Sequence, residues 1–398
     1  MKVIIDENKI KEVFERYVEA VFPSPEKALE IFKSGRRLTF YLGIDPTGPD
    51  IHLGHLVPLL VIKKVTNLGH KAILLIGDFT ARIGDPTGKD MTRQPLSKNQ
   101  VKENMKTYLG QVYKILQKGS VEIKYNSQWL EKMNLEDIIN LGSNFTVQQM
   151  MAREMFQRRL QDQKPISQNE FIYPLLQGYD SVAMEVDGEI GGNDQTFNML
   201  VGRDLVKKML GKEKIVIATK LLENPQSGKK LMSKSEGGFI SLNDSPREIF
   251  GKTMALPDFA ILPLFKLSTE IPDENIVSIE NRLKGEENPK NIKEELAWEL
   301  VRMVYGEKEA GKAKEEFRKI FTEKELPEKM EEFRVDSEGM PLGGFLSEWL
   351  KISKTEAKRL ISEKKAVTVN EQVIESWDYS VKPGDGIKVG PRRFVKAV

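Results

Sequence analysis

The chain has 398 residues, of which 39% are hydrophobic, and it contains no cysteine. A chain of this length is too long for one hydrophobic core, so we expect two or three domains. The absence of cysteine excludes disulfides and thiolate metal sites. With 61 basic and 59 acidic residues the net charge is only +2, which argues against a strong overall field for polyanions.

The basic surplus lies near the C-terminus. Residues 340–398 hold 11 Lys+Arg and 7 Asp+Glu, a local excess of +4, which leaves −2 for the rest of the chain. The first dozen residues contain no apolar stretch long enough for a signal peptide, and no later segment approaches a membrane span. We therefore expect a cytoplasmic protein without membrane contact.

Apolar patterns in the first 220 residues predict an α/β layer structure. Residues 8–33 predict an amphipathic helix, 38–42 a strand, 56–68 a helix and 72–77 a second strand without polar alternation. Further elements are expected at 121–125 (strand), 135–141, 146–161 and 195–210 (helices) and 215–219 (strand). Unalternating apolar strands joined by helices indicate a parallel sheet with both faces covered.

The remainder of the chain divides into further parts. From about 245 the pattern is helical and highly charged, with prolines as breaks, which predicts a separate α-helical domain. The polar segment after 321 is poor in large apolar residues and is typical of a mobile linker. The predicted boundaries are 1–240 for the α/β domain, 241–322 for the helical domain, 323–339 for the linker and 340–398 for the last domain.

Two of the three histidines, His52 and His55, flank Leu53 and Gly54 where a predicted strand and turn lead into a helix. The first turn of a helix offers unpaired N–H groups and a positive dipole end, and Gly54 lets a nucleotide approach the backbone. Imidazoles spaced (i, i+3) can donate to phosphate oxygens from one side. The plainer alternative is one capping and one core histidine.

Two other interpretations of such motifs are weaker. A zinc site needs further ligands, and the chain offers only His70 as another histidine. The segment from Gly84 to Lys89 resembles a Walker phosphate loop, but its glycines are one residue too close and Asp90 follows the lysine. We therefore expect no tightly bound metal and no Walker loop.

A second motif lies at residues 225–238, where Gly228, Gly237 and Gly238 flank a lysine-rich segment. Such a segment can flex and place lysines against a polyphosphate. Most lysine runs are solvated loops, but residues 232–235 (Met-Ser-Lys-Ser) are a specific tetrapeptide rather than charge alone.

Together the two motifs carry a resemblance. Residues 52–55 (His-Leu-Gly-His) resemble the HIGH signature, and residues 231–235 (Leu-Met-Ser-Lys-Ser) the KMSKS signature, of class I aminoacyl-tRNA synthetases. Leu231 stands where that family has its first lysine, and Lys230 stands one residue earlier. The resemblance implies a Rossmann-like doubly wound parallel sheet as the catalytic domain. The catalytic residues that it implies are His52, His55, Lys230 and Lys234.

A third segment bears on the amino-acid substrate. On a helix Tyr173, Gln177 and Asp180, at i, i+4 and i+7, form one polar stripe in an otherwise apolar segment. Polar groups on a buried stripe need polar partners. Together with residues 191–195 (Gly-Gly-Asn-Asp-Gln), this pattern resembles bacterial tyrosyl-tRNA synthetases. An ordinary helix at a dimer interface is the alternative.

The resemblance implies a role for each matching position. Asp180 and Tyr41 would read the phenolic hydroxyl of tyrosine, and both would stay unpaired around phenylalanine. The implied tyrosine contacts are Tyr41, Gly43, Asp45, Asp85, Tyr173, Gln177, Asp180 and Gln195. The implied ATP contacts are Asp45, His52, Gly54, His55, Gly192, Asp194, Met232, Ser233, Lys234 and Ser235.

The last domain combines two helical patterns with short strand patterns. Ser353 and Glu356 predict a capping box at the start of its second helix. Lys354, Lys358 and Arg359 would line one face of that helix. The order of elements is similar to the ribosomal-protein-type RNA-binding domain of bacterial tyrosyl-tRNA synthetases, so we expect a small α+β RNA-binding domain. A solvated basic helix is the alternative.

The resemblance also implies a reaction and its partners. The chain would join L-tyrosine and ATP, the latter bound with magnesium, and transfer the tyrosyl group to the terminal adenosine of tRNA(Tyr). Since the family's dimer interface lies in the insert that holds residues 145–156, a homodimer is expected. Three alternatives stay open: a tryptophan-specific relative, a non-catalytic RNA-binding relative and a plain nucleotidyltransferase.

Overall fold

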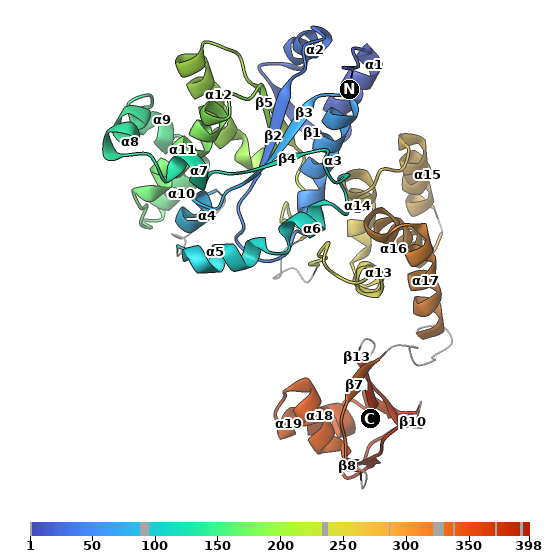
Figure 1. Ribbon diagram of the computed structural model, residues 1–398. Coiled ribbons are helices and arrows are strands. Elements are labelled where there is room, and N and C mark those ends of the chain that lie inside the picture. Colours follow the sequence, from blue (N-terminus) through green and yellow to red (C-terminus); the bar gives the residue numbers. More distant parts are fainter. Residues whose placement is uncertain are drawn as a thin grey trace. The chain divides into compact units, whose positions relative to one another are not determined.

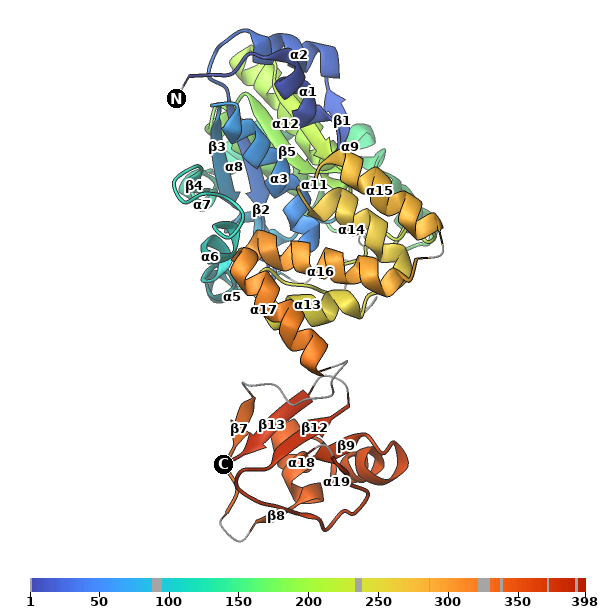
Figure 2. The same ribbon diagram turned by 90° about the vertical axis from the view of Figure 1, so that its right-hand side faces the viewer.

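The computed structural model describes residues 2–87, 95–232, 238–285, 287–320, 330–336, 339–370, 372–390 and 393–398. The chain divides into two compact units, Met1–Gly306 and Glu307–Val398, each with its own sheet (Figures 1 and 2). None of the helices in the described ranges is long and apolar enough to cross a membrane.

A six-stranded sheet forms the centre of the first unit, in the order β1-β6-β5-β2-β3-β4. Its strands are β1 (Val18–Phe22), β2 (Thr39–Ile44), β3 (Lys71–Ile76), β4 (Glu122–Tyr125), β5 (Gly188–Gly192) and β6 (Ile215–Thr219). Strands β2 to β6 run parallel, and the edge strand β1 is antiparallel to β6. Because β6 is buried along its whole length, the predicted parallel sheet with covered faces is confirmed.

The order of the strands reverses between β2 and β5. From β2 the chain continues through α3 (Leu53–Asn67) to β3 on one side, whereas from β5 it continues through α12 (Thr196–Leu210) to β6 on the other. Since such crossovers are right-handed, α3 and α12 cover opposite faces of the sheet (Figure 1). In doubly wound folds ligands bind at this reversal, beyond the carboxyl ends of the strands.

Further helices surround the sheet. The segment between β3 and β5 ends in α11 (Asn169–Ala183), which packs along α12. The shorter helices of this segment are α4 (Thr80–Ile83), α5 (Lys98–Met105), α6 (Tyr108–Val112), α7 (Ser127–Leu130), α8 (Leu135–Gly142), α9 (Val147–Met151) and α10 (Glu154–Gln161).

The N-terminal segment does not form the single helix predicted over 8–33. It forms α1 (Glu7–Phe14), then β1, then α2 (Pro25–Lys33). Pro23 disfavours a continuous helix, and Ser24 caps the start of α2 through its side chain. The apolar residues between the two helices pair with β6 instead, so pairing in the sheet overrides the helical periodicity.

The helix predicted over 146–161 is also divided, into α9 and α10. The break falls at Arg153, whose backbone is extended (φ −65°, ψ 130°). Its buried guanidinium donates to Thr87 Oγ1 over 2.7 Å. This tertiary contact, which the sequence pattern does not reveal, holds the backbone away from helical geometry.

A helical segment follows the sheet but belongs to the same compact unit. It consists of α13 (Pro246–Met254), α14 (Ile261–Ser268), α15 (Asp273–Lys284) and α16 (Pro289–Tyr305). The next helix, α17 (Glu307–Arg318), falls in the second unit. The division of the chain therefore differs from the predicted helical domain over 241–322.

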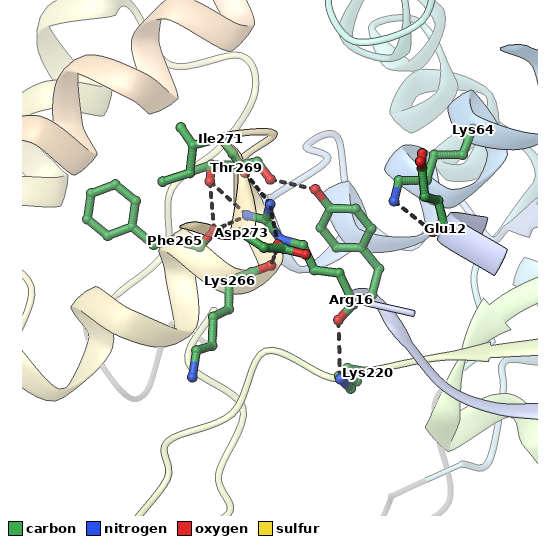
Figure 3. A network of polar contacts seen from close by, with 10 residues as sticks. Glu12, Arg16, Lys64, Lys220, Phe265, Lys266, Thr269, Ile271 and Asp273 are labelled. Carbon is green, nitrogen blue, oxygen red and sulfur yellow. Dashed lines mark hydrogen bonds and ion pairs between the residues drawn. The ribbon is translucent and has the colours of Figure 1, made fainter. Parts of the chain in front are cut away.

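Hydrogen bonds from Arg16 connect this helical segment to the N-terminal part of the unit (Figure 3). Its guanidinium donates to the carbonyl oxygens of Phe265 over 2.6 Å, Lys266 over 2.7 Å and Ile271 over 2.5 Å. The last carbonyls of a helix lack intrahelical partners, so one guanidinium completes the end of α14. This contact helps to explain why the helical segment is not a separate unit.

The second unit is a small α+β structure. Its strands β7 (Glu331–Phe333), β9 (Val367–Val369), β10 (Gln372–Val373), β12 (Gly386–Val389) and β13 (Arg393–Ala397) form a sheet in the order β10-β9-β12-β13-β7, beside a two-stranded sheet of β8 (Met340–Pro341) and β11 (Ser380–Val381). The helices α18 (Leu342–Leu350) and α19 (Lys354–Lys358) complete it, and a π-helical turn, Arg359–Glu363, continues α19. Phe345 and Leu346 of α18 are fully buried in its core.

The structure corrects the predicted linker over 323–339. Residues 331–333 form β7, which pairs in parallel with β13. The segment is short and polar, so its strand character comes from the neighbouring strand rather than from an apolar pattern of its own.

Candidate active site

A cavity of about 540 Å³ opens at the carboxyl ends of β2 and β5, where the strand order reverses. Every predicted catalytic residue and every predicted tyrosine or ATP contact in the described part of the chain lines it. These residues are Tyr41, Gly43, Asp45, His52, Gly54, His55, Asp85, Tyr173, Gln177, Asp180, Gly192, Asp194, Gln195, Lys230 and Met232. Ser233, Lys234 and Ser235 lie outside the described residues.

His52 and His55 form the start of α3 and face each other, with ring centroids 4.0 Å apart. His52 Nδ1 accepts from the Gly54 N–H over 3.1 Å, and His55 Nδ1 accepts from the His52 N–H over 3.3 Å. A ring nitrogen that accepts carries no proton, so in each neutral imidazole the proton lies on Nε2. Each histidine therefore caps the helix with one nitrogen and keeps the other as a donor.

The surroundings keep both imidazoles neutral. Burial lowers the pKa of His52 to about 3, with a smaller contribution from the neighbouring His55. Burial also lowers the pKa of His55 to about 4, against the opposing effect of Asp194. At neutral pH both side chains are therefore uncharged hydrogen-bond donors. The sequence predicted donors at these positions but not their charge.

Two glycines make room for polar side chains of the cavity. A Cβ on Gly54 would lie 2.9 Å from His52 Cε1, so the folded-back ring requires glycine there. A Cβ on Gly77 would lie 1.9 Å from Asp45 Oδ1 and 2.4 Å from Thr80 Oγ1. Gly77 was not predicted, because its role depends on a contact between distant segments.

Asp45 follows β2 and is held by two donors. Its Oδ1 accepts from Thr80 Oγ1 over 2.8 Å, and its Oδ2 accepts from Tyr173 Oη over 2.8 Å. Burial, assisted by the charge of Asp45, raises the pKa of Tyr173 well above its usual value. The carboxylate is therefore fixed in orientation at the centre of the cavity.

Tyr41 and Asp180 lie at the buried end of the cavity, at 0% and 2% exposure. Tyr41 Oη lies 3.0 Å from Ser181 Oγ. Asp180 accepts from Trp129 Nε1 over 2.7 Å and from Asn126 Nδ2 over 3.2 Å. Burial raises the pKa of Asp180 well above its usual value, although these two donors oppose the shift.

A chain of amides connects the remaining contacts. Gln195 Nε2 donates to Asp85 Oδ2 over 2.5 Å, and Gln195 Oε1 accepts from Asn198 Nδ2 over 3.0 Å. The same Asn198 nitrogen donates to Gln177 Oε1 over 3.0 Å, and Gln177 Nε2 donates to Glu189 Oε1 over 3.1 Å. Each amide is thus oriented by its neighbours.

Lys230 reaches the cavity although it stands one residue before the family's lysine position. Its Nζ pairs with Asp194 Oδ2 at 2.6 Å. Leu231, in contrast, is only 7% exposed. The structure thus brings together Asp194, a predicted ATP contact, and Lys230, a predicted catalytic lysine.

The sequence prediction missed several polar residues around the cavity. They are Thr80, Asn126, Trp129, Ser181, Glu189, Asn198 and Lys214. Asn126 and Trp129 follow the end of β4 directly, a position that could have identified them. Among the described residues, no group of three or more His, Asp or Glu side chains could hold a metal ion.

In the second unit Lys354, Lys358 and Arg359 are exposed on α19 and the turn that follows it. Ser353 Oγ accepts from the Glu356 N–H over 3.2 Å, which confirms the predicted N-cap. The described contacts do not include the reciprocal bond of a capping box. The three cations are therefore presented to solvent by a capped helix.

The chain is similar to known proteins in sequence and in fold. Residues 33–322 match the family described as tRNA synthetases class I (W and Y). The tyrosine–tRNA ligase of Carboxydothermus hydrogenoformans is 43% identical over 99% of both chains, and that of Dehalococcoides mccartyi is 42% identical over 98% of this chain and 99% of its own. A C-terminally truncated mitochondrial tyrosyl-tRNA synthetase of Aspergillus nidulans, 23% identical, shares the fold with a TM-score of 0.65 over 79% of this chain and 94% of its own.

The doubly wound sheet, the paired histidines at its strand-order reversal and the family match define the class. The chain belongs to the class I aminoacyl-tRNA synthetases of the tryptophan and tyrosine group. Within that group it falls among the bacterial-type tyrosine–tRNA ligases, since relatives of that kind match it over nearly its whole length.

Proposed function

We propose that the cavity joins L-tyrosine to ATP as tyrosyl-adenylate, releases pyrophosphate and then transfers the tyrosyl group to the terminal adenosine of tRNA(Tyr). The observation that supports this proposal is that two chemically different ends line one cavity. A buried end contains Tyr41 and Asp180, and a second end, which we call the polar end, contains His52, His55 and Lys230. Holding both substrates in one orientation converts their encounter into an intramolecular step.

At the buried end, Asp180, which already accepts from Trp129 and Asn126, accepts a hydrogen bond from the hydroxyl of the substrate phenol, and Tyr41 binds the phenolic oxygen. Phenylalanine would leave both groups without a partner in a buried site, which disfavours its binding. The α-amino group of the substrate tyrosine would bind to three hydrogen-bond acceptors of the cavity. These are the carboxylates of Asp45 and Asp85 and the side-chain oxygen of Gln177. An ammonium group, which only donates, matches this set.

At the polar end, a carboxylate oxygen of tyrosine attacks the α-phosphorus while the bond to pyrophosphate breaks. His52 and His55 donate their Nε2 protons to phosphate oxygens, and such fixed donors stabilise charge that develops in the transition state. Asp194 and Gly192 hold the ribose. When ribose hydroxyls bind to Asp194, Lys230 is released toward the phosphates. Lys234, outside the described residues, is the second lysine that the proposal assigns to the phosphates, and magnesium arrives with ATP as part of the substrate.

We also propose a homodimer that works in the cytoplasm, where tRNA is charged. Leu135, Ile139 and Val147, on α8 and α9, are 75%, 61% and 70% exposed. Val147 also lines a second, mostly apolar cavity with Phe145 and Met150. Grouped apolar residues on a surface mark protein contacts, and a second copy of the same insert would cover them.

Tyrosine-dependent exchange between ATP and pyrophosphate tests the activation step. We expect exchange with tyrosine and none with tryptophan, and charging of tRNA(Tyr) in a second assay. A folded protein that supports exchange with tryptophan alone, or with neither amino acid, would overturn the proposal.

The RNA-binding role of the second unit has its own test. Replacement of Lys354, Lys358 and Arg359 by glutamine should raise KM for tRNA and weaken its salt dependence, because contacts to RNA phosphates are lost. Exchange activity should stay unchanged, since it needs no tRNA. An unchanged KM for tRNA would assign these cations to the solvated surface only.

A further inference from the structure

A buried ion pair lies behind the tyrosine end of the cavity, and the proposed reaction leaves it without a role. Lys214 is 0% exposed, and its Nζ contacts a carboxylate oxygen of Glu189, which is 2% exposed. Lys214 Nζ also donates to Ser181 Oγ over 2.7 Å and to the Met199 carbonyl over 3.2 Å. An ammonium has three protons and no lone pair, so Lys214 is the donor at all three contacts.

The hydrogen bond between Ser181 and Tyr41 has the same direction, with Ser181 as the donor. Ser181 Oγ lies 3.0 Å from Tyr41 Oη but 3.5 Å from Glu189 Oε2. Hydrogen bonds between hydroxyl oxygens span about 2.5–3.0 Å. Ser181 therefore donates its proton to Tyr41, in the shorter of the two contacts. Ser181 thus accepts from Lys214 and donates to Tyr41, which leaves the proton of Tyr41 for another acceptor. The side chain of Glu189 is one such acceptor, and a ligand in the cavity is another.

We propose that Lys214 and Ser181 are positioning residues that fix Tyr41 as the hydrogen-bond donor to the substrate phenol. This inference rests on the proposed tyrosine site and deepens it. A phenol has one proton to give and an oxygen that accepts, so it fits between the donor Tyr41 and the acceptor Asp180. The chain of hydrogen bonds then runs in one direction from an ammonium to a carboxylate, and such chains polarise each of their bonds.

The residues around Lys214 leave space for this chain of hydrogen bonds and compensate the charge of the lysine. A Cβ on Gly202 would lie 2.6 Å from Lys214 Nζ and 3.0 Å from Ser181 Oγ. Burial lowers the pKa of Lys214, and the carboxylate of Glu189 opposes that shift. Glu189 Oε1 in turn accepts from Gln177, so one carboxylate both compensates the lysine and orients an α-amino contact.

The variant Ser181→Ala tests the link, because it removes one hydroxyl and leaves the pair of Lys214 and Glu189 in place. The matched control is Ser268→Ala, another fully buried serine, on α14 and outside the cavity lining. In Ser181→Ala we expect Kd for tyrosine to rise about tenfold, the effect of one net hydrogen bond. Kd for phenylalanine and KM for ATP should stay unchanged, and a purely structural role would shift all three.

The direction of the bond is tested in the wild-type protein with 4-aminophenylalanine. Its amino group offers protons on both sides and is a poor acceptor, so it opposes a donating Tyr41. We expect it to bind at least about tenfold more weakly than tyrosine, again the effect of one hydrogen bond. In Ser181→Ala the difference in affinity between tyrosine and 4-aminophenylalanine should decrease, because the hydroxyl of Tyr41 can turn and accept a hydrogen bond from the amino group.

Two results would overturn the inference. One is equal binding of tyrosine and 4-aminophenylalanine by the wild-type protein, a measurement that needs no variant to fold. The other is a ratio of tyrosine to phenylalanine affinity that is unchanged in folded Ser181→Ala. If Tyr41→Phe and Asp180→Asn also leave that ratio unchanged, the proposed tyrosine site itself has failed, and the two failures are thereby distinguished.

Discussion

The two ends of the cavity differ in how firmly their polar groups are held. At the tyrosine end, Tyr41, Asp180 and Lys214 are at most 2% exposed, and each has hydrogen-bond partners inside the fold. At the phosphate end, the side chain of Lys230 is 57% exposed, and that of its partner Asp194 is 26% exposed.

The difference fits the roles that we propose for the two ends. An amino acid is selected by polar groups that stay unpaired around a wrong ligand, and that penalty exists only where water is excluded. A triphosphate brings its own charges and leaves in part as pyrophosphate, so Lys230, unlike the two fixed histidines, must exchange partners. Rigid burial therefore suits selection, and an accessible lysine suits turnover.

The largest effect is expected from Asp180→Asn. The amide keeps the size of the side chain but turns one acceptor into a donor that faces Trp129 or Asn126. We expect KM for tyrosine to rise roughly 100-fold, as for loss of a charged hydrogen bond, with KM for ATP unchanged. Asp204→Asn, an exposed aspartate on α12, is the matched control. A similar rise in KM for ATP would show that the two ends are not independent.

At the phosphate end, His52→Asn separates catalysis from helix capping. Asparagine is a favoured N-cap, so α3 should keep its start and the melting temperature should change little. The Nε2 donor is lost, and kcat for exchange should fall roughly 100-fold without a change in KM for tyrosine. Ser97→Asn, which places asparagine at the N-cap of another helix, α5, serves as the control. A rise in KM for tyrosine in place of the fall in kcat would assign His52 to binding.

A smaller effect is expected from Lys230→Gln. Loss of one mobile cation should lower kcat for exchange about tenfold. Lys229→Gln changes the neighbouring lysine, which does not line the cavity, and an exposed charge of this kind should alter the rate less than about twofold. Equal effects of both variants would mean that the segment acts through its total charge rather than through Lys230.

The two ends also differ in how well the sequence predicted them. His52, His55 and Asp194 belong to short motifs, and the parallel sheet was evident from β2 and β3, because these signals are local. The partnership of Lys214 with Glu189 was not predicted, because it depends on the alignment of β5 with β6. For the same reason β1 was mistaken for part of a helix.

The smallest effect tests the neutral state of the histidines through stability. The pKa is lowered from 6.5 to about 3 for His52 and to about 4 for His55 and His70, mainly by burial. Between pH 6.5 and 5 the unfolded chain therefore binds more protons than the folded one. The free energy of unfolding should fall as the pH falls, by up to about 1.4 kcal/mol per pH unit for each histidine.

Urea denaturation between pH 7.5 and 5 measures this slope. Above pH 6.5 the histidines should contribute none, and a lowered carboxylate such as Glu7, with a pKa of about 2, costs stability only below about 4.5. His52→Asn removes one of the three groups and should flatten the slope accordingly. The same slope in wild type and variant would mean that His52 binds protons equally in the folded and the unfolded chain, so that its pKa is not lowered by burial in the folded protein.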